Sequence, residues 1–243
     1  MDLGIAGKRA LVLGGLKGLG LAVADALRAE GAEVIAASRS ATGAARVDLA
    51  DRASVEALAS DLLGGGVDIL VNNSGGPAPG PAATAAVEDW TRGFEAMAAN
   101  LFHLTTLLLP PMRERGWGRI ATIVSSGVEQ PIPNLAVSNG VRAAIVGWSK
   151  TLAAEVAGDG VTVNVVLPGR IHTDRVDALD AANAARSGTD IEAVRAASRA
   201  TIPAGRYGRP EEFAAVVAFL CSAKASYVTG SRVRCDGGMI RGI

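Results

Sequence analysis

A glycine-rich turn near the start of the sequence has residue types and a spacing that suit phosphate binding. An apolar run, Ala10–Leu13, stops at Gly14. Gly18 and Gly20 follow, and an Ala- and Leu-rich segment then ends at Gly31. Glycines let a pyrophosphate approach bare backbone at a helix N-terminus, where free N–H groups and the helix dipole favour anions. We therefore expect a strand, a tight turn that binds a dinucleotide, and a helix; a plain strand–helix connection is the alternative.

A basic residue follows the second apolar run, residues 34–38. In dinucleotide-binding folds this strand end faces the adenosine ribose, where an acidic side chain binds the 2′-hydroxyl and a basic one accepts a 2′-phosphate. Here Ser38 and Arg39 occupy that place without a carboxylate, and Lys17 lies in the glycine turn. An arginine–phosphate contact contributes about 1.5–3 kcal/mol. We therefore expect NADP rather than NAD; two solvated surface cations are the alternative.

Strand-like and helical runs alternate along the chain, which predicts the elements that position these residues. Strands are expected near residues 8–13, 33–38, 44–48, 67–71, 118–124, 161–167 and 231–235. Helices are expected near residues 18–30, 52–63, 84–113, 136–157, 174–200 (broken) and 210–222. This alternation is typical of an α/β fold, here a Rossmann-like doubly wound parallel sheet of seven strands with helices on both faces.

Length and composition predict one globular domain over residues 1–243. Apolar residues make up 49% of the chain and charged ones 20%, which argues against disorder. The 24 basic and 24 acidic residues balance, so we expect neither nucleic acid nor an anionic membrane as a partner. The most apolar helical run, residues 101–109, is too short and too polar to span a bilayer. The polar, Ala-rich stretch 173–206 is expected to be a substrate loop or lid, with a plain surface excursion as the alternative.

The cysteines and the N-terminus indicate a reducing compartment. Cys221 and Cys235 are the two cysteines, and they form neither a disulfide framework nor a metal-binding spacing. Asp2 precedes a direct entry into the first strand, without the features of a signal peptide. We therefore expect free thiols, no metal site and a cytoplasmic protein.

Six further short sequence motifs follow the glycine turn along the chain. They are Asp48-Leu49, Asn72–Gly75, Gly118–Ile120 leading to Ser125-Ser126, Val163–Gly169, Gly205–Glu212 and Asp236–Gly238. Together they resemble the short-chain dehydrogenase/reductase family over essentially the whole chain, and most of all its 3-oxoacyl-acyl-carrier-protein reductase branch. The resemblance implies hydride transfer between a nicotinamide and a carbonyl or alcohol carbon of a small-molecule substrate. It also implies a homotetramer or homodimer, formed through the helices near 84–113 and 136–157 and the C-terminal strand.

The resemblance further implies which residues contact the cofactor. Asp48 and Leu49 would flank the adenine, and the Asn73–Gly75 stretch would contact the ribose and pyrophosphate. The segment after the sixth strand would contact the nicotinamide end. With the glycine turn and the cations added, the predicted cofactor-binding residues are Gly14, Leu16, Lys17, Gly18, Leu19, Gly20, Ser38, Arg39, Asp48, Leu49, Asn73, Ser74, Gly75, Arg142, Pro168, Gly169, Ile171 and Thr173.

The sequence departs from the family at the proton-transfer residues. The family uses an Asn-Ser-Tyr-Lys tetrad, with the Tyr and Lys in a Tyr-x-x-x-Lys helix. Counting along this chain places Ser138 at the Tyr position and Arg142 at the Lys position. Met97 falls at the Asn position, although Asn100 lies one helical turn further on. Of the four tetrad residues, Ser125 alone remains.

These replacements have chemical consequences. A serine hydroxyl is a far poorer acid than a phenol, so Ser138 can donate a hydrogen bond but hardly a proton. Arg142 can bind ribose hydroxyls and supply charge, but it cannot relay a proton as lysine does. Because a general acid is worth about 10²–10⁴ in rate, ordinary ketone reduction should be slow. We expect Ser125, Ser138 and Arg142 to polarise a substrate oxygen, with His172 as a candidate proton donor; packing and cofactor-holding roles are the alternatives.

Two other stretches resemble a divergent subgroup of the family. One is the loop Gly75–Gly80 with its two prolines, and the other is Pro131–Leu135, which precedes a Ser-Asn-x-x-Arg helix. The resemblance indicates a distinct site design. The first hypothesis is therefore an NADP-dependent oxidoreductase with an atypical site, and because the site lacks a strong acid, an iminium, an activated enone or a strongly electrophilic ketone would suit it best as substrate. An NADP-binding protein without turnover, serving as a sensor or structural subunit, is the second hypothesis. A domain that has lost nucleotide binding is disfavoured, because the phosphate turn is complete.

Overall fold

The sheet determines where the predicted site residues meet. The structure is a computed structural model that describes residues 2–242. Its strands are β1 (Arg9–Leu13), β2 (Glu33–Ala37), β3 (Ile69–Asn72), β4 (Gly118–Ile123), β5 (Val161–Pro168) and β6 (Arg232–Cys235). They pair in the order β2-β1-β3-β4-β5-β6, and every pairing is parallel. The doubly wound α/β prediction is confirmed, and the carboxyl ends of all strands lie at one edge of the sheet.

The predicted strand at residues 44–48 is wrong, so the described sheet has six strands rather than seven. The chain instead makes one 3₁₀ turn at Gly43–Ala45. It touches the sheet at a single bridge, where Ser38 donates its N–H to Ala45 O (3.2 Å) and accepts from the N–H of Val47 (3.0 Å). Asp51, the cap of the next helix, follows so closely that no ladder can extend.

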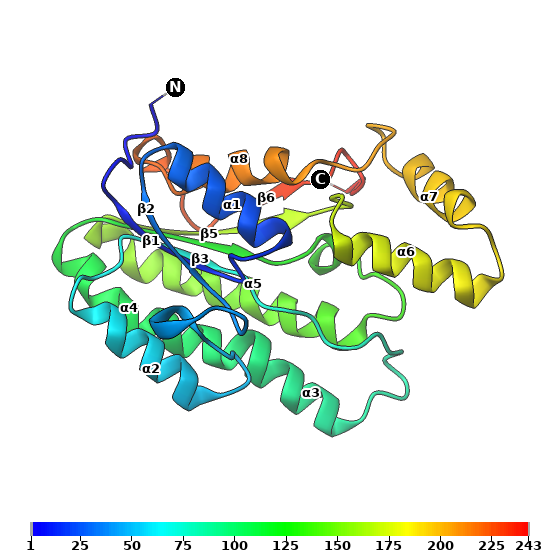
Figure 1. The fold of residues 1–243 in the computed structure, drawn as a ribbon, viewed down its shortest axis with the longest axis horizontal. Helices are drawn as coiled ribbons and strands as arrows, with labels where there is room; N and C mark the ends of the chain where they lie inside the picture. The colour runs from blue at the N-terminus through cyan, green and yellow to red at the C-terminus, as the bar shows by residue number, and fades with distance from the viewer. Residues whose placement is uncertain (1, 243) are drawn as a thin grey trace.

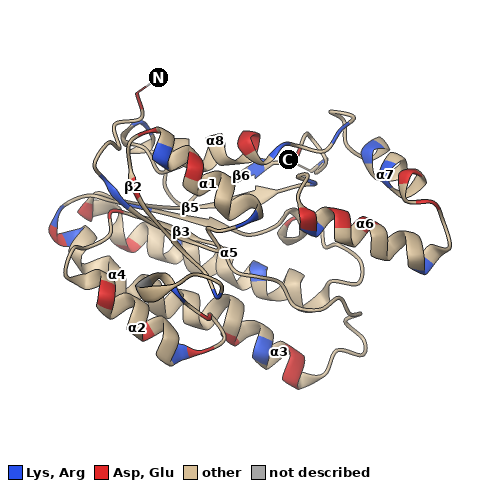
Figure 2. Ribbon diagram, viewed as in Figure 1, with Lys and Arg blue, Asp and Glu red and all other residues tan. Residues whose placement is uncertain are grey.

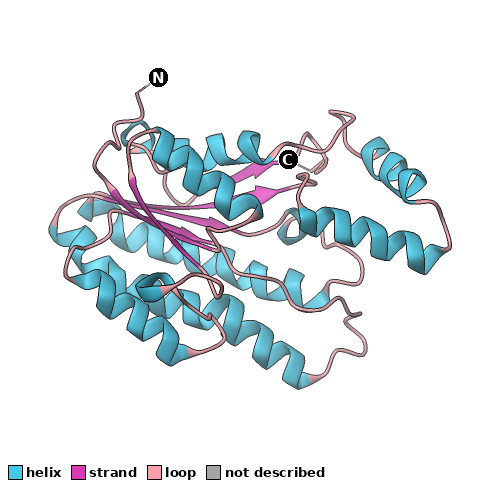
Figure 3. Ribbon diagram, viewed as in Figure 1, coloured by secondary structure: helices cyan, strands magenta, loops and turns pink. Residues whose placement is uncertain are grey.

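Helices cover both faces of the sheet (Figures 1 and 3). On one face lie α1 (Gly18–Ala29) and α8 (Pro210–Leu220). On the other lie α2 (Arg52–Leu63), α4 (Asn100–Glu114) and α5 (Ala136–Val156). This arrangement confirms the predicted layers.

Alternate strand residues pack into opposite layers of the core. Val12 of β1 is buried with Val23 of α1 and Phe213 of α8. Its neighbour Leu11 is buried on the other face with Leu104 of α4. Strand β1 is therefore apolar on both faces, as is usual for parallel sheets, whereas the edge strand β6 exposes Arg232 and Arg234 on one face. Burial of one apolar side chain in these layers contributes about 1.5–3 kcal/mol to the stability of the fold. Packing in both layers therefore holds the strands, and with them the strand ends that carry the site, in place.

The helix predicted at residues 84–113 is divided into three parts. Helix α3 (Val87–Phe94) passes into one turn of π-helix, Glu95–Ala99, and then into α4. Such π turns occur frequently near functional sites. Met97 lies in this turn and is 3% exposed, packed in a core cluster with Val137 and Val141 of α5.

Helices α6 (Asp174–Ser187) and α7 (Ile191–Ala200) extend beyond the carboxyl ends of β5 and β6 (Figure 1). They make up most of the predicted substrate loop, and the helix predicted as broken over residues 174–200 is interrupted between Ser187 and Ile191. Asp180 of α6 is fully buried and accepts hydrogen bonds from Arg170 Nη1 (3.1 Å) and the Tyr207 hydroxyl (2.8 Å). Because α7 has no buried residue, polar contacts rather than an apolar core hold this region. Its action as a lid remains a prediction.

Charges and thiols add few constraints on the fold. Basic and acidic residues are interspersed along the helices (Figure 2). Between residues 2 and 242, no helix has the length and apolar character needed to cross a membrane, and no cluster of metal-ligating side chains is found in that range. Cys221 is a free buried thiol, and burial raises its pKa to about 12.

We predict that Asp180→Ala loosens α6 and α7 and leaves the sheet intact. The change leaves the Tyr207 hydroxyl and the Arg170 guanidinium without their buried acceptor, which costs about 1–3 kcal/mol. Hydrogen–deuterium exchange should become faster over residues 174–200 and stay unchanged in β1 and β3. Asn183→Ala, one turn further along α6, is the matched control and should leave exchange as in the wild type. Unchanged exchange in Asp180→Ala would show that the buried carboxylate does not hold these helices.

Candidate active site

The glycine turn is shaped by close backbone contacts that exclude side chains. Gly14 (φ +63°) and Gly18 (φ +55°) adopt left-handed backbone conformations. A Cβ on Gly20 would lie 2.2 Å from Gly14 O, and one on Gly14 would lie 2.7 Å from Asn73 Nδ2. Lys17, at the N-cap of α1, makes no side-chain hydrogen bond to the helix. The first-turn N–H groups therefore have no side-chain cap, which fits a bound pyrophosphate.

The turn lies at the point where the strand order reverses. Strand β1 is flanked by β2 on one side and β3 on the other, and ligands of doubly wound sheets bind at the carboxyl ends of such strands. Asn73, which follows β3, packs against Gly14 and Gly20. Thr173, just before α6, lies 3.9 Å from a Cβ placed on Gly18. The structure thus brings together three parts of the predicted cofactor-binding set.

A hollow of about 460 Å³ lies beside the carboxyl end of β2. It is lined by Arg39, Arg46, Asp48, Asp51 and Ser54. Both guanidinium groups are on exposed residues, and two arginines at one hollow suit a phosphate. The predicted Lys17 is exposed and does not line this hollow.

Sequence reasoning missed Arg46. The residue reaches this place through the backbone bridge between the 44–48 segment and Ser38. A sequence feature that could have predicted Arg46 as a site residue is its place in the strand-like run 44–48, directly before the apolar Val47. The two acidic side chains of the hollow are engaged in local turns: Asp48 accepts from the N–H of Ala50 and Asp51 from that of Ala53, each at 3.0 Å.

Asn100, rather than Met97, contacts the adenine side of the predicted site. Its buried side-chain amide donates to Leu49 O at 2.9 Å. The loop that follows the 44–48 segment is thereby held by the first residue of α4. Met97, which counting along the sequence placed at the tetrad asparagine position, is packed in the core.

Arg142 of α5 is a buried cation at the centre of the candidate site. It is 6% exposed. Its guanidinium donates to three main-chain oxygens, Ile123 O in β4 (3.3 Å) and Ser74 O (3.5 Å) and Gly75 O (3.0 Å) after β3. Burial, and secondarily the charge of Arg175, lowers the pKa of Arg142 to about 10. The group therefore remains protonated at neutral pH, and it forms no ion pair with any carboxylate among residues 2–242.

The two unusual stretches of the sequence interlock in front of α5. The Gly80 N–H donates to Asn134 O (2.8 Å), and the Ala136 N–H donates to Gly80 O (3.1 Å). Asn139 closes the second stretch by donating its side-chain amide to Ile132 O (2.9 Å). Asn134 has φ +62°, a conformation that asparagine tolerates better than most residues. These contacts fix the start of α5.

Ser125 and Ser138 lie on neighbouring elements without a hydrogen bond between them. Ser125 follows β4, and its Oγ accepts from the Gly127 N–H at 3.0 Å. A Cβ on Gly127 would lie 2.5 Å from Asn139 Oδ1, so this turn packs directly on α5. Ser138, one helical turn before Arg142, is buried. The two hydroxyls can thus approach one ligand from β4 and α5.

The remaining side chains that could donate a proton are those of His172 and the two tyrosines. His172 has a side chain that is 64% exposed, with Nε2 3.4 Å from Asp177 of α6. Tyr207 donates its hydroxyl to Asp180, and burial raises the pKa of this phenol. Tyr227 is fully exposed. Neither tyrosine forms a hydrogen bond with Ser138 or Arg142 in the described part of the chain.

The segment after β5 is fixed against the C-terminal part of the chain. Pro168 ends the strand, and the Gly169 N–H donates to Cys235 O at 3.0 Å. Ile171 is buried and forms a backbone bridge with Gly208. This loop leads into α6, so the predicted nicotinamide contacts lie between β5 and the predicted lid.

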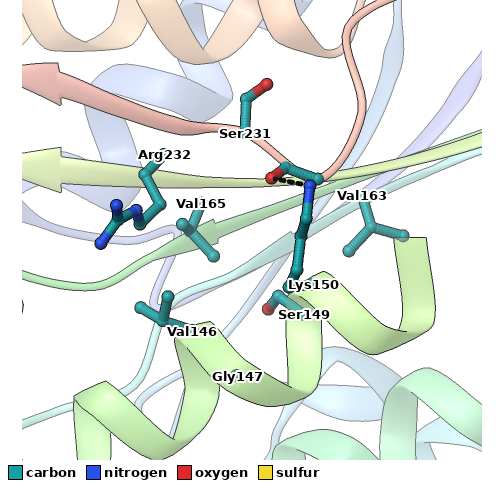
Figure 4. Close-up of a pocket in the computed structure, with 9 residues that line it drawn as sticks. Val146, Gly147, Ser149, Lys150, Val163, Val165, Ser231 and Arg232 are labelled. Carbon is teal, nitrogen blue, oxygen red and sulfur yellow. Dashed lines mark hydrogen bonds between the residues drawn. The ribbon is translucent and has the colours of Figure 1, made fainter. Parts of the chain in front are cut away.

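A second hollow, of about 430 Å³, lies away from these residues, between α5 and strands β5 and β6 (Figure 4). Lys150 crosses it and donates to Gly230 O at 3.2 Å. Val146, Val163 and Arg232 are among its lining residues. None of the predicted site residues lines it.

Comparisons with known sequences match the whole chain. A family model described as enoyl-(acyl carrier protein) reductase matches residues 14–240. The 3-oxoacyl-[acyl-carrier-protein] reductase of Salmonella typhimurium is 36% identical over 250 residues, which cover 96% of this chain and 97% of that protein. The corresponding reductase of Vibrio cholerae is 35% identical over 254 residues, which cover 98% and 99%.

Solved structures with the same fold contain NADPH. L-sorbose reductase from Gluconobacter frateurii, solved with NADPH and L-sorbose, is 32% identical with a TM-score of 0.93 and covers 100% of both chains. A variant of actinorhodin polyketide ketoreductase, solved with NADPH, is 32% identical with a TM-score of 0.89 and covers 96% of this chain and 97% of its own. On these matches and the fold, the chain belongs to the short-chain dehydrogenase/reductase family.

Proposed function

We propose that this protein is an NADP(H)-dependent oxidoreductase whose substrate is electrophilic enough to accept hydride without a phenol acid. The observation that carries the proposal is the buried, protonated Arg142, one helical turn from the Ser138 hydroxyl, where the family has its lysine and tyrosine. This arrangement can stabilise negative charge but is poor at delivering a proton. An activated enone or iminium suits such a site best.

The residues present fit NADP. The uncapped first turn of α1 and the glycine turn would hold the pyrophosphate. Arg39 and Arg46 would bind the 2′-phosphate at their shared hollow. The NADPH and NADP in the related structures support the same choice. The bound cofactor would supply or accept the hydride at its nicotinamide C4.

The chain's own residues would act on the substrate oxygen. When hydride adds to the β-carbon of an enone, the π electrons shift toward the carbonyl oxygen and leave an enolate. An enolate is a weaker base than the alkoxide left by ketone reduction, so it depends less on an immediate proton and more on a nearby cation and hydrogen-bond donors. Ser138 and Ser125 would donate hydrogen bonds to that oxygen, and Arg142 would supply charge. Water, or His172 at the exposed loop, would then supply the proton.

One observation favours a second function, an NADP-binding protein without turnover. The terminal nitrogens of Arg142 already bond three main-chain oxygens, which suits a purely structural role. NADPH oxidation with cyclohexenone and cyclohexanone tests the two functions. Faster oxidation with cyclohexenone supports the reductase, whereas equal rates with both ketones contradict the proposed electrophile requirement. NADPH binding without oxidation by any enone or iminium would support the second function.

We predict that Arg39→Ala weakens NADPH binding and leaves NADH binding unchanged. Loss of one charge-assisted contact to the 2′-phosphate should raise the Kd for NADPH roughly ten- to hundredfold. Arg46→Ala should act in the same direction, because it lines the same hollow. Fluorescence titration of both dinucleotides measures the effect. Arg28→Ala, which removes an exposed cation paired with Asp25, is the control. An equal loss for NADH would show that the hollow does not select the phosphate.

We predict that Ser138→Tyr/Arg142→Lys gains ordinary ketone reductase activity. The change restores a phenol near a cation and should increase kcat/KM for cyclohexanone by about 10²–10⁴. Ser138→Phe/Arg142→Lys adds the same ring without the hydroxyl and should gain nothing. Circular dichroism should establish that both variants fold. If the tyrosine variant is folded, binds NADPH and is no faster than the phenylalanine one, the missing phenol is not what limits ketone reduction.

A further inference from the structure

Arg142 is a cation that burial has separated from water without giving it a counter-ion. Its three hydrogen-bond acceptors are neutral main-chain oxygens. None of the ion pairs found among residues 2–242 includes it. A buried charge with no opposite charge is unfavourable, and such groups cluster at sites where a ligand supplies the compensation.

A second guanidinium adjoins the same loop. Arg175 stands in the first turn of α6, and its Nη2 lies 2.3 Å from where a Cβ on Gly76 would be. Glycine at position 76 thus gives the Arg175 guanidinium its room. Arg142 bonds the oxygen of Gly75, the residue before. The two cations are close enough for Arg175 to lower the pKa of Arg142.

Of the carboxylates near Arg175 in sequence, Asp174 directly precedes it and forms no ion pair among residues 2–242, and the next two are directed to other partners. Asp177 pairs with Arg195 (2.9 Å) and with His172 (3.4 Å). Asp180 binds Arg170 and the Tyr207 hydroxyl. No ion pair in the described part of the chain includes Arg175. Two neighbouring guanidinium groups therefore share no carboxylate.

The loop between the two cations also carries an unsatisfied hydroxyl. Ser74 is 7% exposed, and its Oγ has no hydrogen-bond partner among the described residues. Its main-chain oxygen accepts from Arg142. Buried hydroxyls are normally hydrogen-bonded. The loop Ser74–Gly76 thus carries one unpaired buried hydroxyl and adjoins two guanidinium groups without a carboxylate partner, the buried Arg142 and the exposed Arg175, and an anionic oxygen would suit this arrangement.

We propose that Arg175 and Ser74, beside the buried charge of Arg142, bind a carboxylate of the substrate, so that the protein acts on oxo acids or unsaturated oxo acids; Ser74, which the sequence assigned to the cofactor, would then serve the substrate. This inference rests on the proposed reductase function. Guanidinium groups match the planar, two-oxygen geometry of a carboxylate. The cofactor's pyrophosphate would be held separately, by the uncapped first turn of α1 next to Asn73. From Asn73 the chain runs through Gly76 to Gly80 and the start of α5, which is the side where Ser138 lies.

Helix α6, part of the predicted lid, would then distinguish negatively charged substrates from neutral ones. Arg175 belongs to α6, which the buried Asp180 anchors to the body of the protein. Arg142 belongs to α5 in the core. A carboxylate bound by Arg175 beside the charge of Arg142 would connect the two helices, whereas a neutral ester or amide would leave the two cations uncompensated.

The test uses one acid and its neutral counterpart, with Arg175→Met as the variant. We measure NADPH oxidation with acetylacrylate and its methyl ester, the Kd for NADPH, and calorimetric binding of levulinate to the NADP⁺ complex. The wild type should have a KM for the acid roughly tenfold or more below that for the ester. Arg175→Met should raise the KM for the acid to that of the ester, with the ester's KM, kcat and the NADPH Kd little changed. Arg186→Met, an exposed arginine at the other end of α6, should behave as the wild type.

Two results would overturn the proposal. One is a wild type that binds and reduces the acid no better than the ester. The other is a tenfold or greater loss of NADPH affinity in Arg175→Met with the acid-to-ester ratio unchanged, which would assign the cation to the cofactor's pyrophosphate. If neither probe is reduced, levulinate binding decides. Binding that depends on Arg175 supports the carboxylate site while the reductase function fails, and binding that is absent or independent of Arg175 rejects the site itself.

Discussion

The candidate site depends on a single buried guanidinium. Arg142 reaches from α5 to the ends of β3 and β4 and bonds main-chain oxygens from both. A lysine ammonium is a compact charge on a flexible stem, whereas the planar fork of arginine presents several donors in fixed directions. Arginine at this position can therefore brace two loops at once. Helix α5, which carries the Tyr and Lys in relatives that relay protons, here also connects the carboxyl ends of β3 and β4.

The unusual stretches around Arg142 form one structural unit. The loop after β3 bonds to the segment before α5 through Gly80 and Asn134, and Asn139 ties that segment to α5. A change in one stretch would displace the other and would shift Ser138 with it. This mutual dependence supports the proposed atypical site.

Much of the fold follows from local pattern, whereas the site depends on contacts that pattern does not contain. The alternation of apolar runs predicted the layers, because strands such as β1 bury apolar side chains on both faces. The strand at 44–48 failed because a 3₁₀ turn and a helix cap leave room for one bridge only. Arg46 and Arg175 were not predicted, since each reaches the site through a distant pairing, with Ser38 in one case and Gly76 in the other. Residues fixed by short motifs, such as Gly14 and Gly20, were within reach of sequence reasoning.

The π turn between α3 and α4 has a consequence for aligning this chain with its relatives. A π turn holds more residues than the 3.6 of an α turn, so side-chain directions counted from Trp90 no longer apply beyond Ala99. Counting from Trp90 places Met97 at the position of the family asparagine, yet the polar amide that reaches the adenine-side loop is that of Asn100. A count of residues along this helix therefore does not by itself tell which side chain faces the loop, because the π turn changes the direction of every side chain that follows it.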